Sequence, residues 1–258
     1  MRLVKELWEY REMIYSLVKR DLKSRYKGSV LGFFWMFLNP LLQLVVYTIV
    51  FSTIMQTGID KFYLFLFVAL VPWLFFSTCL SAGAGVIFSQ QNMVKKIYFP
   101  REVLPLSFTI SQFVNMLLSF LVIFAVLVIS GSRIRIRAIV YLPLIMLIEF
   151  VLALGVTYIV SAMNVYFRDL EHILGILSMA WMYLTPILYP IDRVPVQYMR
   201  LFYINPMTPI TISYRDVLYY GHAPQIQTLM QAFLMGIAVL AAGQMIFGKL
   251  QRHFAEEL

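Results

Sequence analysis

Residues 62–89 read FYLFLFVALVPWLFFSTCLSAGAGVIFS and contain no Asp, Glu, Lys or Arg. A helix of about 20 apolar residues crosses the roughly 30 Å hydrocarbon core of a bilayer. The stretch is therefore long enough to span a membrane, with Pro72 in its first half. A chain that holds such a segment is expected to be an integral membrane protein.

The composition of the whole chain agrees with that expectation. Of its 258 residues, 61% are hydrophobic and only 13% are charged. Soluble domains carry about 25% charged residues, so this chain has too little charge for a surface that faces water on all sides. Outward from residues 62–89, further apolar segments occupy 31–55, 103–130, 138–162, 173–189 and 226–248.

These segments predict an all-α integral membrane protein with six transmembrane helices in a single domain, residues 1–258. Asn39-Pro40 predicts a kink in the first span, because proline lacks the backbone donor and restricts the residue before it. The span at 173–189 is the shortest, and Pro186 lies near its end.

Residues 1–28 precede the first span and alternate apolar and charged positions at helical spacing. This pattern predicts an amphipathic helix that lies in the membrane interface. A helix that packs on a soluble partner is the alternative. Between the fifth and sixth spans, Pro206 and Pro209 interrupt a stretch that could hold two short helices dipping into one membrane face.

Lysine and arginine indicate the orientation of the chain. The N-terminal segment, 90–101, 164–172 and the C-terminal tail lie on one side of the six predicted spans and together hold fourteen of the 21 basic residues. The positive-inside rule places that side in the cytoplasm. Arg133, Arg135 and Arg137 are an exception on the other side, either a local deviation or a site for an anionic group. The net charge of +8 is spread over span ends, so nucleic acid is not expected as a partner.

Sequence motifs for catalysis are absent. There is no G-x-x-x-x-G-K-[ST] phosphate-binding loop, no nucleophile elbow and no H-E-x-x-H. Cys79, His172, His222 and His253 are too scattered to predict a metal site. We therefore expect a protein that is not an enzyme, whose energy comes from another chain or from an ion gradient.

Polar residues recur along two of the spans. Asn39, Gln43 and Tyr47 follow one another at steps of four, so they share one broad helical stripe, and Trp35 extends it. Ser107, Ser111 and Asn115 repeat this spacing on the third span. Such stripes face a cavity or a neighbouring helix, because lipid cannot satisfy their hydrogen bonds.

Aromatic residues supply the other candidate positions. Trp181, Tyr183 and Tyr189 on the fifth span could pack on the C–H faces of sugar rings, or form an interfacial belt. The candidate substrate pathway thus comprises Trp35, Asn39, Gln43, Tyr47, Ser111, Asn115, Trp181, Tyr183 and Tyr189.

Three further features leave alternatives open. Glu149 is the sole acid deep in a span, and it has either a structural partner or a role in transport. Close helix contact is expected at Gly83 and Gly85, or at Ala238 and Ala242. The segment 90–102 is short, basic and aromatic, which suits either a knob that docks on a cytoplasmic partner or an ordinary positive-inside loop.

Five segments, in order, carry a resemblance that covers essentially the whole chain. They are RDLKSRYKGSVLGFFWMFLNPL (20–41), NMVKKIYFPREVLP (92–105), NVYFRDL (164–170), TPILYP (185–190) and NPMTPI (205–210). Together they resemble the permease subunit of bacterial polysaccharide ABC exporters, most closely the O-antigen type, with capsule and teichoic acid permeases nearby.

The resemblance implies a cell inner-membrane permease with both termini in the cytoplasm. It implies a homodimer, two copies of a separate ATP-binding subunit that holds ATP and Mg, and no cofactor bound directly. The expected substrate is an undecaprenyl-diphosphate-linked glycan, surrounded by membrane lipids. A teichoic acid or capsule polymer, or an ion-coupled secondary transporter, is the alternative.

The resemblance also implies functional segments. The predicted contact with the ATPase comprises Lys95, Lys96, Tyr98, Phe99, Pro100 and Arg101. Residues 193–220 are expected to form an outer gate of two short helices, with Arg193, Asn205, Pro206, Pro209 and Arg215 as gate residues.

Overall fold

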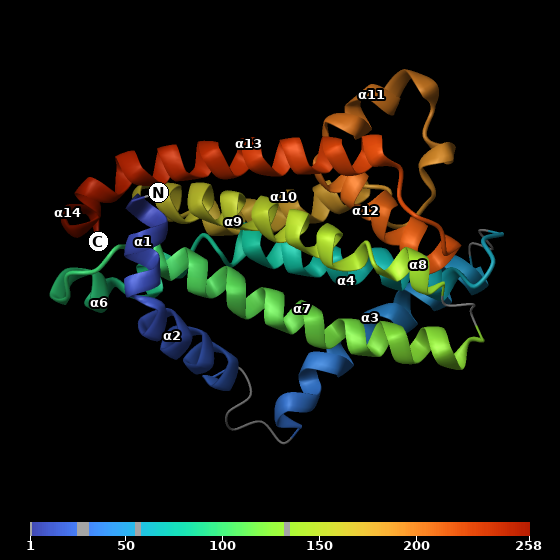
Figure 1. The fold of residues 1–258 in the computed structure, drawn as a ribbon, viewed down its shortest axis with the longest axis horizontal. Helices are drawn as coiled ribbons and strands as arrows, with labels where there is room; N and C mark the ends of the chain where they lie inside the picture. The colour runs from blue at the N-terminus through green and yellow to red at the C-terminus, as the bar shows by residue number, and fades with distance from the viewer. Residues whose placement is uncertain (1, 25–30, 55–57, 132–134) are drawn as a thin grey trace.

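The computed structural model describes residues 2–24, 31–54, 58–131 and 135–258, and this part of the chain is helical, without strands. The long helices run side by side along the longest axis of the molecule, with both termini at one end (Figure 1). We call this end proximal and the opposite end distal. The prediction of an all-α protein is confirmed.

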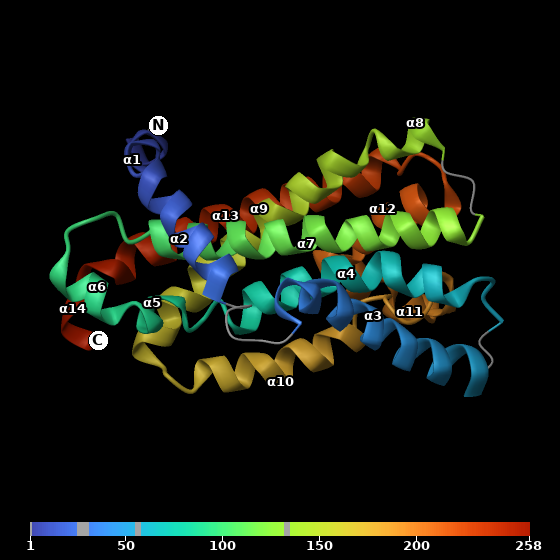
Figure 2. The same cartoon turned by 90° about the horizontal axis from the view of Figure 1, so that it is seen from below.

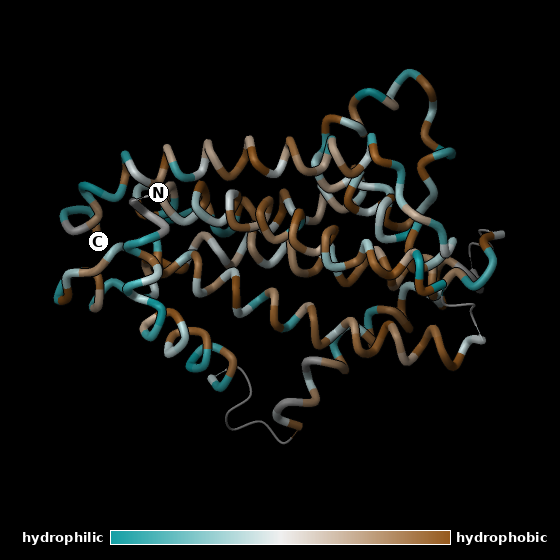
Figure 3. Tube along the Cα trace, in the orientation of Figure 1, coloured by the Kyte–Doolittle hydropathy of each residue, from teal (hydrophilic) through white to brown (hydrophobic). Residues whose placement is uncertain are grey.

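Four helical stretches in the described part of the chain are long and apolar enough to cross a membrane. They are Phe62–Ser81, Val103–Ile129, Ile136–Tyr166 and Ile226–His253. They contain the helices α4 (Phe62–Ser81), α7 (Val103–Ile129), α8 (Ile136–Ile139) with α9 (Leu142–Tyr166), and α13 (Ile226–Leu250). Hydrophobic residues line the middle of these helices, and hydrophilic residues gather towards both ends of the molecule (Figure 3).

The other two predicted spans form shorter helices, so the count of six is not confirmed. The first is built from η1 (Gly32–Phe34), α3 (Trp35–Thr48) and the π-helical η2 (Ile49–Ile54), and α3 continues through a buried Pro40. The other is α10 (Leu170–Tyr183), whose 14 residues extend about 21 Å at 1.5 Å per residue. It ends in a turn before Pro186, earlier than the sequence predicted.

Helix α4 occupies the centre of the bundle, where α3, α7, α9, α10 and α12 (Met207–Arg215) contact it. Every side chain from Leu64 to Val71 is buried, and so is Cys79. A helix that is surrounded by protein can be apolar on all faces. This central position explains why α4 has no polar stripe.

Helices α9 and α13 form the most extensive helix pair, and glycines allow their close approach. A Cβ atom on Gly155 would lie 2.6 Å from the Leu240 Cα atom, and one on Gly243 would clash with the Gly155 carbonyl oxygen. A Cβ atom on Gly83, just after α4, would clash with the Cys79 carbonyl oxygen and lie 3.2 Å from the Thr157 methyl group on α9. Ala238 and Ala242, the alternative positions for close contact, are exposed and make none within the described part of this chain.

At the proximal end, α1 (Arg2–Glu9) and α2 (Arg11–Ser24) lie across the ends of the long helices, with α2 against α7 (Figure 2). Their apolar side packs on the chain itself. Leu7, Ile14 and Leu17 contact a cluster that includes Phe247 and Phe254. The location of α1 and α2 in a membrane interface stays a prediction.

The remaining short helices lie at the two ends of the bundle. At the proximal end are α5 (Val86–Ser89), α6 (Gln91–Lys96), η5 (Gln251–His253) and α14 (Phe254–Glu257). At the distal end, η3 (Ile191–Arg193), α11 (Val196–Ile204), α12 and the π-helical η4 (Asp216–Tyr220) follow α10. Helix α11 protrudes from the bundle there (Figure 1). Residues 193–220 thus contain two short α-helices, α11 and α12, and their location at an outer membrane face stays a prediction.

Candidate functional site

A groove between α3 and α7 brings the two predicted polar stripes together. Trp35, Asn39 and Gln43 line it from α3, and Gln112 and Asn115 line it from α7, around a cavity of about 240 Å³. Asn39 and Gln43 are exposed in this single chain. Residues 76 positions apart, at Asn39 and Asn115, therefore share one polar surface.

The Gln112 amide on the α7 side is only partly satisfied. The Asn115 Nδ2 atom lies 3.5 Å from the Gln112 Oε1 atom that it faces as a donor. The buried Nε2 atom of Gln112 has no hydrogen-bond partner among the described residues. An unmatched amide donor in the wall of a groove favours a ligand that offers oxygen acceptors.

A second groove continues from the first between α3 and α10, around a cavity of about 510 Å³. Gln43 lines both grooves, and Tyr47, Trp73 and Ser178 belong to the second. The predicted α3 stripe therefore forms one continuous surface, which we call the α3 groove. None of the residues that line its two parts in the described structure is charged.

Four other predicted pathway residues lie outside the α3 groove. The buried Ser111 hydroxyl donates to the Ser107 carbonyl at 3.0 Å. The Trp181 ring packs edge-on against Phe76. Tyr183 is exposed, and its carbonyl accepts a hydrogen bond from the Tyr189 hydroxyl. Spacing along a helix cannot show which of its polar faces borders open space.

Asn205 joins the distal helices to α10. Its Oδ1 atom accepts from the Trp181 indole Nε1 and from the Met207 backbone amide, both at 3.0 Å. Its Nδ2 atom donates to the Thr185 hydroxyl at 2.8 Å and to the Leu184 carbonyl at 3.2 Å. All four hydrogen-bonding positions of the amide are thereby used, so Asn205 holds the start of α12 against α10 and the turn that follows it.

Arg215, at the end of α12, also binds the turn that follows α10. Its buried guanidinium lies 3.6 Å from the centroid of the Phe65 ring and donates to the carbonyls of Phe65, Pro186, Ile187 and Tyr189. The carbonyls of Pro186, Ile187 and Tyr189 lie beyond the last residue of α10, Tyr183, whereas Phe65 belongs to α4.

The other predicted gate residues differ in exposure. Pro206 immediately precedes α12, Pro209 is buried within it, and Arg193 is exposed at the end of η3.

Glu149 has the structural partner that was one of the two expectations. The Tyr214 hydroxyl donates to the Glu149 Oε2 atom at 2.6 Å, and both side chains are fully buried. Glu149 lines neither part of the α3 groove. No local pattern pointed to Tyr214, because the pair joins α9 to α12 across 65 positions.

The segment 90–102 separates into an exposed part and an anchored part. Lys95, Lys96 and Tyr98 project outward, and 97% of Tyr98 is exposed. Phe99 is buried in the proximal apolar cluster. Arg101 donates to the Gln251 carbonyl and lies over the Phe254 ring at 5.8 Å.

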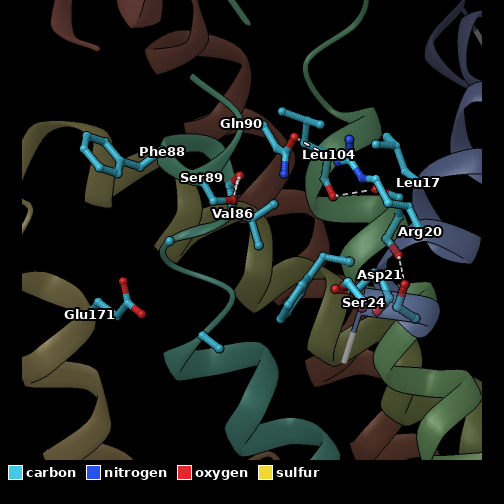
Figure 4. Close-up of a pocket in the computed structure, with 15 residues that line it drawn as sticks. Leu17, Arg20, Asp21, Ser24, Val86, Phe88, Ser89, Gln90, Leu104 and Glu171 are labelled. Atoms are coloured by element: carbon cyan, nitrogen blue, oxygen red, sulfur yellow. Dashed lines mark hydrogen bonds between the residues drawn. The ribbon is translucent and has the colours of Figure 1, made fainter. Parts of the chain in front are cut away.

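A polar cavity of about 390 Å³ lies beside this segment, between α2, α5 and α7 (Figure 4). The Arg20 guanidinium donates to the Gln90 side chain at 2.9 Å across it, and Asp21 and Glu171 also line it. Two carboxylates and one guanidinium among these residues disfavour a multiply charged anion.

At the distal end, Arg135 and Arg137 are exposed, and Arg133 lies outside the described residues. Nearby, Asp216 is buried. Burial raises its pKa, and the neighbouring His222 opposes that shift.

Long apolar helices around a neutral polar groove define a multi-pass membrane protein of the transport class. Residues 12–219 match the model of the family described as ABC-2 type transporter, and the chain belongs to that family.

Similar proteins cover nearly its full length. An O-antigen export system permease protein RfbA from Myxococcus xanthus is 38% identical over 260 residues, covering 100% of both chains. Another protein of that name, from Klebsiella pneumoniae, is 31% identical over 247 residues, covering 96% of this chain and 95% of the relative. The polysialic acid transport protein KpsM of Escherichia coli is 21% identical over 240 residues, covering 91% and 92%.

Proposed function

We propose that this chain is the transmembrane subunit of an ATP-driven exporter that moves a lipid-linked, O-antigen-like polysaccharide across the cell inner membrane. The α3 groove carries this proposal, because it joins amide and aromatic side chains from two distant segments without a charge. The names of the two RfbA relatives supply the substrate class. The glycan is carried on undecaprenyl diphosphate.

The chemistry of the groove suits a sliding sugar chain. Asn39, Gln43 and Asn115 offer amide donors and acceptors to sugar hydroxyls, and Trp35 and Tyr47 offer ring faces to their C–H groups. A net hydrogen bond exchanged against water contributes only about 0.5–1.5 kcal/mol. Weak, repeated contacts of this size let a long polymer advance without becoming trapped.

The groove is completed by a second copy of the chain. The outward face of α3 exposes Leu42, Val45 and Val46, each more than half accessible. An apolar face beside an open polar groove fits a homodimer, in which two grooves enclose one channel within the membrane lipids.

Two copies of a cytoplasmic ATP-binding subunit, which hold ATP and Mg, supply the energy. In this arrangement the termini and Tyr98 face the cytoplasm, and the distal helices act as the outer gate. Lys95, Lys96 and Tyr98 contact the ATPase, while Phe99 and Arg101 anchor the segment to the bundle.

Two alternatives are less well supported. An ion-coupled secondary transporter needs a charged relay, but Glu149 is bonded to Tyr214 and lies outside the groove. A permease for capsule or teichoic acid polymers shares the architecture. The identity to the capsule-type relative, 21%, is lower than the 38% to the O-antigen permease.

The groove can be tested in cells that lack their own O-antigen permease and receive this chain with its ATPase. Gln43→Leu combined with Asn115→Leu keeps the bulk and removes the amides, and surface polysaccharide should fall at least about tenfold. Gln227→Leu, on an exposed position of α13, is the matched control. Normal export by the double variant, at equal membrane abundance, would remove the groove from the pathway.

Coupling to the ATPase is tested separately. Purified complexes with Tyr98→Ala and Lys95→Glu should lose transport-dependent stimulation of ATP hydrolysis, because both side chains project from the bundle. The variant Gln227→Ala, at an exposed position of α13, should behave as the unmodified complex. Failure of any ATP-binding subunit to co-purify would refute the proposed assembly.

A further inference from the structure

A second polar pocket lies at the distal end, apart from the α3 groove. It encloses about 220 Å³ between the turn that follows α10 and the end of α12. Asp192, Asp216, Tyr220 and His222 line it, and none of its lining residues belongs to the α3 groove. Pockets for drug-sized ligands measure about 300–1,000 Å³, so this one suits a single small ring.

An aromatic platform forms one wall of this pocket. The rings of Tyr220 and His222 are nearly parallel, with an interplanar angle of 8° and centroids 5.8 Å apart. Tyr219 packs edge-on against Tyr220 at 4.9 Å, and its hydroxyl donates to the Asp60 carbonyl at 2.5 Å. The platform is thus held in place, yet half of Tyr220 stays exposed.

Hydrogen bonds also fix the position of His222. Gly221, at φ +71°, turns the chain after η4, and the His222 amide donates to the Asp216 carbonyl at 2.8 Å. The His222 Nε2 atom then lies 3.6 Å from the Asp216 Oδ1 atom. The Nδ1 atom faces the Ala223 carbonyl at 3.1 Å. The aromatic wall and the carboxylate are therefore positioned together.

The charges of the pocket select against anions. Asp192 and Asp216 contribute two carboxylates. The guanidinium of Arg215 is bonded to four backbone carbonyls, so it fixes the wall and has little capacity left for a ligand. Carboxylates accept hydrogen bonds from hydroxyl groups, and an aromatic face packs against C–H groups.

We propose that this distal pocket binds one neutral sugar ring of the glycan, with the ring's C–H face on Tyr220 and its hydroxyls donating to Asp192 and Asp216. This inference rests on the proposed function and adds a second sugar site, at the distal end. A ring held there opposes return of the polymer into the groove. Each sugar is released as the next one arrives, because the contacts are few.

The test uses the purified permease in lipid nanodiscs. The probe is lipid-free polysaccharide, released by mild acid from cells that carry this permease's native export system. Saturation-transfer NMR should show contacts to the sugar ring protons. Tyr220→Ala should weaken binding about five- to tenfold, whereas Tyr220→Phe, which keeps the ring, should bind as the unmodified chain does. Asp192→Asn, at an exposed position, should weaken binding about threefold or more.

Two controls make the outcome decisive. Tyr198→Ala removes an exposed aromatic of α11 that lies outside the pocket, and it should leave binding unchanged. The inference is overturned if Tyr220→Ala binds as well as the unmodified chain, or if the unmodified chain gives no saturation transfer. Surface polysaccharide in complemented cells is measured in parallel: normal export without binding refutes the distal site alone, and absent export refutes the proposed function.

Discussion

The glycine contact between α9 and α13 gives a quantitative prediction. Replacing Gly155 by Ala places a Cβ atom 2.6 Å from the Cα and N atoms of Leu240. Carbon atoms pack favourably at about 3.5–4.0 Å, so the two helices must separate by roughly 1 Å. Overpacking of this kind costs about 1–3 kcal/mol. A chain of this size loses about 2–4 °C in Tm per kcal/mol.

We therefore expect Gly155→Ala to lower the Tm by about 4–8 °C, taking about 2 kcal/mol for the clash. Tryptophan fluorescence during heating, in one detergent for all variants, measures the change. Gly248→Ala on α13 is the matched control: its Cβ atom meets nothing within 4 Å, so the Tm should stay equal or rise.

Gly236→Ala should fall between the two, because its nearest atom is the Ile148 carbonyl oxygen at 3.4 Å. Equal Tm values for the Gly155 and Gly248 variants would refute the close approach of α9 and α13. Loss of expression confined to Gly155→Ala would agree with it.

Three further predictions concern polar contacts, one of them fully buried. Tyr214→Phe removes the hydroxyl that donates to Glu149 and should lower the free energy of unfolding by about 1–3 kcal/mol. In the double variant with Glu149→Gln, the loss of stability should differ from the sum of the two single losses, and strict additivity would disprove the pairing. Asn205→Ala should raise amide hydrogen exchange at residues 205–208 at least about tenfold, with Gln227→Ala as an unaffected reference. Gln251→Ala removes a 2.7 Å bond to Glu102 and should increase protease cleavage after Lys95; an unchanged cleavage rate would argue against anchoring by the C-terminal turn.

Hydropathy predicted the long helices well. Residues 103–130 and 226–248 agree closely with α7 and α13, because twenty or more apolar residues in lipid have few alternatives to a helix. The same reasoning was less successful at 173–189. Apolar content alone could not show that α10 ends at Tyr183 and that Arg215 takes up the carbonyls beyond it.

The candidate site was predictable to the extent that it follows one helix. The stripe of Asn39, Gln43 and Tyr47 lies along the groove as its spacing predicted. Ser111 continues the α7 stripe in sequence, but its hydroxyl turns back to its own helix. Contacts between distant segments, such as Tyr214 with Glu149 or Trp181 with Asn205, depend on the packing of whole helices and left no local pattern to read.

The anchoring of segment 90–102 has a practical consequence for experiments. Gln90 is bonded to Arg20 near one end of the chain, and Arg101 is bonded to Gln251 near the other. A displacement of this short segment is therefore transmitted to both chain ends at once. Affinity tags or fluorophores attached at either terminus would lie close to the contacts that hold this segment and could disturb its displacement. A probe intended to report motion without impeding it belongs away from both chain ends.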